Sequence, residues 1–402
     1  MNENKAVPNI RFNDFENKWE KKKLNQIVKK ITRKNSKLQT SLSLTISAER
    51  GIINQNLFFN RQIASRDMSN YFLIKQGEFA YNKSYSKSAP FGTIKRLNRY
   101  NQGALSSLYI VFCPTKVNSD YLVSYFDSSY WYKQLSMIST EGVRNHGLLN
   151  VSPNDFFDMN LSIPYDDKEQ QKIGDFFSKL DKLLDLQQQK IDKLELLKKT
   201  LLQKLFPKHD AQIPELRFKG FEDDWQEKKL SHVVDIIMGQ SPSSTNYYDT
   251  PIENSMILIQ GNADIKHHNV KPRIWTTQIT KIAIPKDVLL TVRAPVGEVA
   301  KNKYEAVIGR GMAALRGNDF LYYNLEKLKE VGYWERLSTG STFESISSND
   351  IRDTKIKIPS CKEQKKVYNL LSKVDQLIEL ENQKLQNFQQ VKKCLLQNMF
   401  VE

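Results

Sequence analysis

The amino-acid sequence predicts an α+β protein in which two β-rich domains of mixed α/β character are each followed by one long α-helix. Three observations support this fold class. A 38-residue stretch with helical periodicity occurs twice, a short aromatic segment precedes each domain, and the regions between them contain short apolar runs separated by Gly and Pro. The chain has 402 residues, which is enough for two domains with separate cores.

The first long helix is expected over Glu169–Phe206. Leu and Ile recur there in steps of three and four, polar residues fill the other faces, and Pro207 ends the pattern. Such a stretch predicts an amphipathic helix that packs against a partner helix. The partner is Glu363–Phe400, because at an offset of 363 − 169 = 194 the two stretches share 16 identities in 38 ungapped positions. The chain is therefore an internal duplication, and each copy ends in the long helix.

A second repeat marks the start of each copy. Pro8–Leu24 and Pro214–Leu230, at an offset of 214 − 8 = 206, agree at nine of 17 positions and share a pattern of Pro, Arg-Phe, Phe-Glu and Trp. We expect Trp19 and Trp225 to anchor these segments onto their domains rather than to contact a ligand.

The two middle regions show the same order of elements at low identity. Short strands are expected at 42–47, 72–82, 92–97 and 107–114 in the first and at 256–261, 282–297, 303–309 and 313–317 in the second. A helical patch follows in each, over Ser119–Met137 and Asp319–Leu337. Ser152 and Ser347, each followed by Asn-Asp, are expected at turns or helix caps. Divergent middles inside a repeated frame predict two recognition modules for different targets.

These repeats divide the chain into four segments. We expect a first domain over 1–165, a first helix over 166–207, a second domain over 208–360 and a second helix over 361–402.

Composition favours a polyanionic partner. The chain carries 60 Lys and Arg against 45 Asp and Glu, a formal charge of +15, and its pI is about 9.4. Nucleic acid is the first candidate. The absence of a long apolar stretch and of a signal-peptide core predicts a cytoplasmic protein without a membrane partner. Three isolated cysteines argue against a disulfide framework and a zinc site.

The sequence contains no recognisable catalytic motif. Gly-rich phosphate loops and the Asn/Asp-Pro-Pro-aromatic loop of amino-methyltransferases do not occur, and His267 and His268 are adjacent rather than one helical turn apart. We therefore predict no catalytic residue and no metal site in this chain. Two alternatives stay open: a nuclease with an unrecognised carboxylate site, and a scaffold or nonspecific DNA-binding protein.

The candidates for DNA contact are polar, basic and aromatic residues on glycine-flanked loops. Arg, Asn and Gln can hydrogen-bond base edges, whereas Lys, Ser and Thr can hold phosphates. The candidates are Lys83, Ser84, Tyr85, Lys95, Arg96, Arg144, Asn145 and His146 in the first middle, and Gln240, Ser241, Ser243, Ser244, Gln260, Asn262, Arg293, Arg310, Ser341, Thr342 and Phe343 in the second. The same glycines could equally serve tight turns.

Two variable domains, each followed by a long repeated helix, resemble the DNA-specificity subunit of type I restriction–modification enzymes. Pro214–Leu230 is similar to the start of a domain in that family. Gly239–Ser243, Gln260–Asn262, Leu290–Gly297 and Gly340–Ser347 are typical of its second target-recognition domain. The first domain fits less closely in its middle.

The resemblance implies a fold and a function. Each target-recognition domain would read one half of a bipartite, asymmetric site in double-stranded DNA. The two helices would pack antiparallel as a coiled-coil-like spacer with pseudo-twofold symmetry. Two methyltransferase (modification) subunits would methylate adenine and two restriction (nuclease–translocase) subunits would cleave DNA. S-adenosylmethionine, ATP and Mg²⁺ would belong to those partners, and this chain would hold no cofactor.

Overall fold

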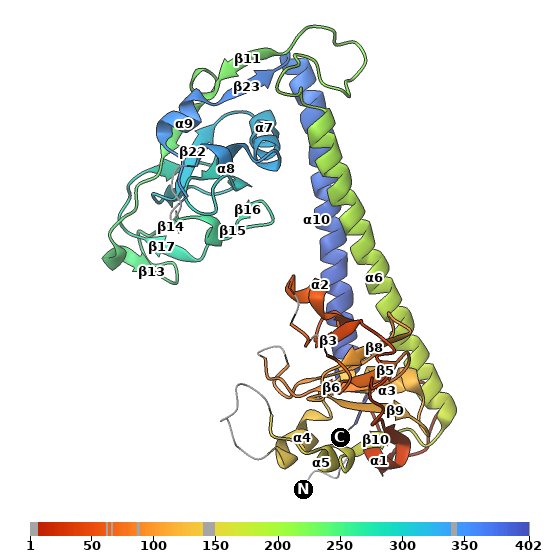
Figure 1. Ribbon diagram of the computed structural model, residues 1–402. Helices are drawn as coiled ribbons and strands as arrows, with labels where there is room; N and C mark the ends of the chain where they lie inside the picture. The colour runs from red at the N-terminus through yellow and green to blue at the C-terminus, as the bar shows by residue number, and fades with distance from the viewer. Residues whose placement is uncertain are drawn as a thin grey trace. The chain divides into compact units, whose positions relative to one another are not determined.

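The computed structural model describes residues 7–61, 63–65, 67–86, 89–139, 149–338 and 344–401 (Figure 1). The chain forms two compact units: unit 1, which contains Met1–Gln188 and Lys384–Glu402, and unit 2, which contains Gln189–Gln383. Both divisions fall inside the long helices, so each unit combines one β-rich domain with half of each helix. The compact units therefore differ from the four consecutive segments that the sequence suggests.

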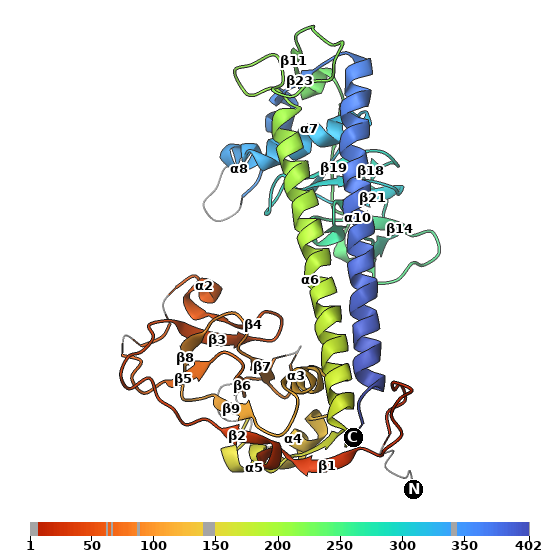
Figure 2. The same cartoon turned by 90° about the vertical axis from the view of Figure 1, so that its right-hand side faces the viewer.

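The two long helices are α6 (Asp167–Lys204) and α10 (Cys361–Asn398), and each begins two residues before its predicted start. In unit 1, Lys392 of α10 lies 2.6 Å from Asp181 of α6. In unit 2, Lys190 pairs with Glu381 at 2.9 Å and Lys198 pairs with Asp375 at 2.8 Å. Because residue numbers rise along α6 as they fall along α10, the two helices run antiparallel within unit 2. Figures 1 and 2 show the two helices side by side within each unit.

The domain of unit 1 contains two four-stranded sheets around a shared apolar cluster. The first sheet, in spatial order, is β2 (Val28–Lys30), β9 (Ile110–Pro114), β6 (Phe79–Asn82) and β7 (Thr93–Arg96). The second is β4 (Gly51–Asn54), β3 (Ser43–Ser47), β8 (Gln102–Leu105) and β5 (Phe72–Lys75). The helices are α1 (Leu24–Ile27), α2 (Gln55–Phe59), α3 (Ser119–Asp127), α4 (Tyr132–Ile138) and α5 (Pro153–Phe157).

The domain of unit 2 is built from a six-stranded and a five-stranded sheet. The six-stranded sheet is β12 (Asp235–Met238), β22 (Met312–Arg316), β19 (Val288–Thr291), β20 (Val299–Lys301), β16 (Asn269–Val270) and β15 (Ile265–Lys266). The five-stranded sheet is β13 (Tyr247–Tyr248), β17 (Ile274–Thr276), β14 (Met256–Ile259), β21 (Ala306–Ile308) and β18 (Ile282–Ala283). The helices are α7 (Asp319–Glu330), α8 (Tyr333–Leu337) and α9 (Ser348–Asp353), with 3-10 turns at Leu230–His232, Ser244–Asn246 and Asn262–Asp264.

The two domains share one topology despite their low identity. The order β2-β9-β6-β7 in unit 1 matches β12-β22-β19-β20 in unit 2, and β4-β3-β8-β5 matches β17-β14-β21-β18. In each second sheet the central pair is parallel, β3 with β8 and β14 with β21. This confirms the prediction that the middles repeat the same order of elements.

Each domain is attached to its helices by the repeated frame. The strand before the domain pairs with the strand after it, β1 (Glu20–Lys23) with β10 (Asn160–Ile163) and β11 (Gln226–Lys229) with β23 (Lys355–Ile358). Trp19 is buried and packs edge-on against Phe400, and Trp225 packs in the same way against Phe206. The two duplicated tryptophans are therefore core residues.

A lysine ammonium group repeats this attachment in each unit, buried in unit 2 and partly exposed in unit 1. In unit 1, Lys392 contacts Asp127 of α3 at 3.1 Å and Asp181 of α6 at 2.6 Å. In unit 2, Lys198 contacts Glu326 of α7 at 2.9 Å and Asp375 of α10 at 2.8 Å. Lys198 and Lys392, and likewise Asp181 and Asp375, are equivalent positions of the duplication.

Some predicted elements are interrupted by turns. The run 72–82 is two strands separated at Gly77, whose φ of +85° is a left-handed conformation that Gly adopts without a Cβ clash. The second helical patch breaks at Gly332, with φ +66°. Ser152 and Ser347 cap α5 and α9, as the sequence predicts, and accept hydrogen bonds from the Asp155 and Asp350 amides. In the described part of the chain, no helix has the length and apolarity needed to cross a bilayer.

Candidate nucleic-acid interface

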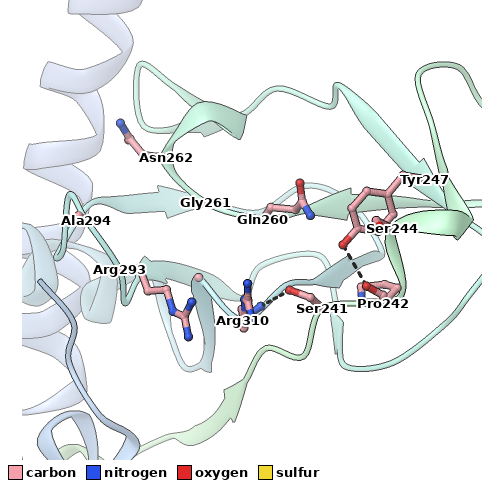
Figure 3. A pocket seen from close by; sticks show the side chains of 11 residues that line it. Ser241, Pro242, Ser244, Tyr247, Gln260, Gly261, Asn262, Arg293, Ala294 and Arg310 are labelled. Atoms are coloured by element: carbon pink, nitrogen blue, oxygen red, sulfur yellow. Dashed lines mark hydrogen bonds between the residues drawn. The ribbon is translucent and has the colours of Figure 1, made fainter. Parts of the chain in front are cut away.

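A cleft of unit 2 lies where several strand ends meet (Figure 3). Its volume is about 640 Å³. Its walls come from four loops: those after β12, β14, β19 and β21. The lining residues are Ser241, Pro242, Ser244, Tyr247, Gln260, Gly261, Asn262, Arg293, Ala294, Arg310 and Gly311.

The cleft brings together candidates that are far apart in the sequence. Six of the predicted DNA-contacting residues line it: Ser241, Ser244, Gln260, Asn262, Arg293 and Arg310. They span 310 − 241 = 69 positions of the chain and stand on separate loops in Figure 3. Sheet pairing explains the assembly, because parallel β14 and β21 end side by side, with Ile259 opposite Ile308.

The cleft has a cationic and polar character. Arg293 and Arg310 are exposed, and neither guanidinium group has a carboxylate partner among the described residues. No acidic side chain stands among the residues that line the cleft in the described chain. Two unneutralised guanidinium groups in one concave surface attract anions, and each offers a planar fork of donors suited to phosphate or to a guanine edge.

Amide side chains complement the two arginines. Gln260 and Asn262 follow β14, and their side-chain amides have no hydrogen-bond partner among the described residues. A free carboxamide presents one acceptor and two donors, the combination that pairs with the adenine edge in the major groove. The cleft therefore combines groups that can hold a phosphate with groups that can distinguish bases.

The loops are held by close backbone packing. A Cβ on Gly239 would lie 2.1 Å from the Gly309 carbonyl oxygen, and a Cβ on Gly311 would lie 2.3 Å from the backbone carbonyl oxygen of Gln260. The Ser241 hydroxyl accepts a hydrogen bond from the Arg310 amide at 3.0 Å. These glycines serve close approach between loops, which keeps the lining side chains in one arrangement.

A buried carboxylate fixes the Gln260 turn. The Asp264 carboxylate accepts hydrogen bonds from the backbone N–H of Gln260 at 2.8 Å and from Arg273 Nε at 2.9 Å. Its charge is thereby paired and hydrogen-bonded inside the fold, as a buried carboxylate requires. Asp264 shapes the loop and does not line the cleft.

Two predicted residues on the same loop have structural contacts instead. Gln240 is held through its backbone. Its backbone N–H donates to the Ile308 carbonyl oxygen, and its backbone carbonyl oxygen accepts from the Thr280 hydroxyl. The Ser243 amide donates to Gln278 Oε1 at 2.7 Å. Neither lines the cleft, so we do not include them in the proposed contact surface.

The predicted residues of unit 1 fall into two groups. Lys83, Ser84 and Tyr85 directly follow β6, and Tyr85 is 57% exposed. Lys95 and Arg96, by contrast, are committed to ion pairs at 2.6 Å with Asp127 and 2.7 Å with Asp120.

Lys95 and Arg96 therefore attach β7 to α3. Because Asp127 and Asp120 already neutralise their charges, we do not include Lys95 and Arg96 in the proposed contact surface. The remaining candidates lie outside the described residues: Arg144, Asn145, His146, Ser341, Thr342 and Phe343.

Sequence reasoning missed Tyr247, which lines the cleft and donates its hydroxyl hydrogen to the Pro242 oxygen at 3.1 Å. The neighbouring Ser-Pro-Ser-Ser run indicated a loop, but nothing in it indicated that a tyrosine five positions from Pro242 would fold back onto it. Among the described residues, no group of three or more His, Cys, Asp or Glu side chains is arranged to hold a metal ion.

Comparison with known proteins places this arrangement in a family. The family model described as "Type I restriction modification DNA specificity domain" matches residues 16–196 and 222–390. A curated relative, the "Putative type I restriction enzyme MjaX specificity subunit" of Methanocaldococcus jannaschii, is 31% identical over 251 residues, covering 59% of this chain and 58% of the relative. The MjaVIII specificity subunit of the same organism is 24% identical over 259 residues, covering 59% and 60%. The chain thus aligns with about three fifths of each of these two relatives.

Solved structures share the fold. The crystal structure of a type I restriction–modification S subunit from M. genitalium matches with a TM-score of 0.61 at 14% identity, covering 98% of this chain and 99% of that one. A chain from a structural study of type I R-M complex assembly matches with a TM-score of 0.59 at 23% identity, covering 95% and 97%. Because the family model matches two segments that together span most of the chain, the chain belongs to the type I restriction–modification DNA specificity family.

Proposed function

We propose that this chain is the DNA sequence-specificity subunit of a type I restriction–modification complex. Each domain would read one half of a bipartite, asymmetric site in double-stranded DNA. Two methyltransferase subunits would then methylate adenine at that site, and two restriction subunits would cleave DNA. The proposed place of action is the cytoplasm, where the DNA is.

One observation carries the proposal: the cleft of unit 2 gathers two arginines and two side-chain amides on tightly packed loops, and none of the four has a side-chain partner in the described part of the chain. Its volume of about 640 Å³ alone would also suit a small molecule, since such pockets measure roughly 300–1,000 Å³. Ligand pockets of that kind are mostly apolar, however, whereas this one is lined by two arginines, two side-chain amides and two serines on loops, beside Pro242 and Tyr247. Those properties, together with the family and the charge of +15, support duplex DNA as the ligand.

The proposal assigns no catalysis to this chain. The residues that line the cleft can bind and orient a polyanion, but the lining that the structure describes includes no Asp, Glu, His or Cys to act as a general base or metal ligand. S-adenosylmethionine, ATP and Mg²⁺ would be held by the partner subunits, which would supply methyl transfer, translocation and cleavage.

The test is methylation mapping by single-molecule sequencing in cells that carry this chain with a cognate methyltransferase subunit. We expect a split motif with methyladenine in both halves, absent when this chain is omitted. Methylation that does not depend on this chain, or that follows no motif, would contradict the proposal.

A matched pair of variants then tests the cleft. Arg293→Ala is expected to weaken discrimination at one half-site by roughly 1–3 kcal/mol, the range for one bidentate base contact. Arg352→Ala is the control, because Arg352 is an exposed arginine of the same unit on α9, outside the cleft. If Arg293→Ala weakened binding equally on all sequences, Arg293 would be a phosphate contact rather than a base contact.

A further inference from the structure

The cleft of unit 2 opens at a junction of three strand ends. Residues 309–311 connect β21 to β22. On one side the Gly309 amide donates to the Ile259 oxygen at the end of β14, at 2.8 Å. On the other side the Val292 amide, after β19, donates to the Gly311 oxygen at 2.9 Å. Gln260 and Arg293 follow these two strand ends, and Arg310 is in the connection itself.

Unit 1 contains the same junction. Residues 106–109 connect β8 to β9, the counterparts of β21 and β22. Leu44 of β3 pairs with Leu105 of β8, and the Thr45 hydroxyl lies 3.3 Å from the Tyr109 hydroxyl. In the other sheet, Tyr81 of β6 pairs with Ile110 of β9. The ends of β3 and β6 therefore both meet the β8–β9 connection.

The chain that leaves these strand ends carries exposed recognition groups. We call them the strand-end surface of unit 1, defined as residues 47–50, 83–85 and 106–108. Arg50 is exposed in the β3–β4 turn, without an ion-pair partner among the described residues. Tyr85 and Leu108 are 57% and 61% exposed. A guanidinium group and exposed apolar groups at one end of a domain match the major groove, where guanine presents acceptors and thymine presents a methyl group.

A second exposed patch of unit 1 lies elsewhere. Helix α2 lies in the connection from β4 to β5 (Figure 2). Its Leu57, Phe58 and Phe59 are all exposed. This helix follows Asn54, the end of β4 opposite to the β3–β4 turn. It has no helical counterpart in the β17–β18 connection of unit 2. Its neighbour Arg61 is therefore an exposed cation of the same unit outside the strand-end surface.

We infer that the strand-end surface is where unit 1 contacts the DNA half-site that unit 2 does not read. This inference rests on the proposed function and goes beyond it by assigning residues that the sequence did not indicate, above all Arg50 and Leu108. The shared topology carries the assignment, because it directs the same three connections to one end of both domains although their residues differ.

The test uses the chain assembled with its methyltransferase subunits and duplexes that carry the mapped motif. One duplex has both halves intact, and two others have one half altered. The half affected by Arg293→Ala identifies the site of unit 2. Arg50→Ala is expected to weaken binding to the intact duplex by roughly 5- to 150-fold, the equivalent of one specific base contact. It should cause no further loss when the half not read by unit 2 is already altered.

Two further variants keep the result interpretable. Tyr85→Ala should affect the same half-site as Arg50→Ala, and Arg61→Ala should bind like the wild type on all three duplexes. Thermal melting of each variant checks that the exposed substitutions leave the fold intact.

The inference is overturned if Arg50→Ala and Tyr85→Ala both bind like the wild type while Arg293→Ala loses one half-site, and the proposed function then stands. It is also overturned if Arg50→Ala and Arg61→Ala weaken all duplexes equally, because the effect would then be general attraction to phosphates. A wild-type complex without any sequence preference would overturn both the inference and the proposed function.

Discussion

Replacing Lys198 by Met tests how the domain of unit 2 is held to its helices. The Lys198 ammonium group lies 2.9 Å from Glu326 on α7 and 2.8 Å from Asp375 on α10, and the lysine itself belongs to α6. The side chains of Lys198 and Glu326 are 11% and 5% exposed, so the ion pair is buried. Burial alone lowers the pKa of Lys198, but the two carboxylates together raise it by more, and its net pKa lies above the ordinary value.

The expected cost follows from what Met leaves behind. Asp375 would keep the Tyr323 hydroxyl at 2.7 Å and Lys301 at 3.3 Å, whereas Glu326 would keep the Tyr322 hydroxyl at 2.6 Å as a hydrogen-bond donor. Removing one partner of a buried ion pair costs about 3–5 kcal/mol of folding free energy, because a charge remains in a poorly solvated site. For a unit of about this size, that corresponds to a fall in Tm of roughly 6–20 °C.

The adjacent lysine provides the control. Lys199 stands on the same helix and pairs with Glu330 of α7 at 2.9 Å, but its side chain is 54% exposed. An exposed pair contributes about 0–1 kcal/mol, so Lys199→Met should leave the melting temperature almost unchanged. Thermal and urea unfolding followed by circular dichroism would measure both variants.

A rescue variant separates charge from packing. Lys198→Met combined with Glu326→Gln and Asp375→Asn removes all three charges and should recover most of the lost stability. Equal melting temperatures for Lys198→Met and Lys199→Met would refute the reasoning. Failure of the triple variant to recover would show that packing of the lysine stem, rather than buried charge, determines the cost.

Four further outcomes are expected. Lys392→Met should destabilise unit 1 in urea unfolding by less than Lys198→Met destabilises unit 2, because the side chains of Lys392 and Asp181 are 18% and 40% exposed and Asp127 keeps Lys95 at 2.6 Å. Gly239→Ala should weaken DNA binding, because its Cβ would lie 2.1 Å from the Gly309 carbonyl oxygen and would displace that loop; titration with a motif duplex checks this. Arg310→Ala should reduce affinity at the same half-site as the other cleft arginine, and an effect at the opposite half would contradict the cleft as one surface. Burial raises the pKa of Asp375, but Lys198, the Tyr323 hydroxyl and Lys301 together lower it by more, so its pKa lies below the ordinary 3.8. The stability that Asp375 contributes is therefore present above about pH 4 and is lost as the pH falls further. Urea unfolding at stepped pH would measure this loss.

The frame of the protein was predictable from the sequence. The long helices, the caps at Ser152 and Ser347 and the buried Trp19 and Trp225 all follow from local patterns that occur twice. Helical periodicity and capping depend on residues within a few positions of each other, so the sequence contains them directly.

Part of the sheet structure was not predictable. Gly103 precedes the predicted strand 107–114, where a turn is expected, yet it lies inside β8, where a Cβ would be 2.2 Å from Leu44 Cδ1. The glycine is required by a close neighbour on another strand rather than by a turn. Lys95 and Arg96 were predicted to contact DNA, but both form ion pairs with carboxylates of α3, more than 20 positions away in the chain.

The sequence by itself determined the duplication, the two long helices, the β-rich middles and the residue types suited to DNA. Only the tertiary structure decided which of those residues share a surface. Gln260 and Arg310 lie 310 − 260 = 50 positions apart and line one cleft because β14 and β21 pair in parallel. Strand pairing is selected by packing across the whole core, and the composition of a single strand does not specify its partner.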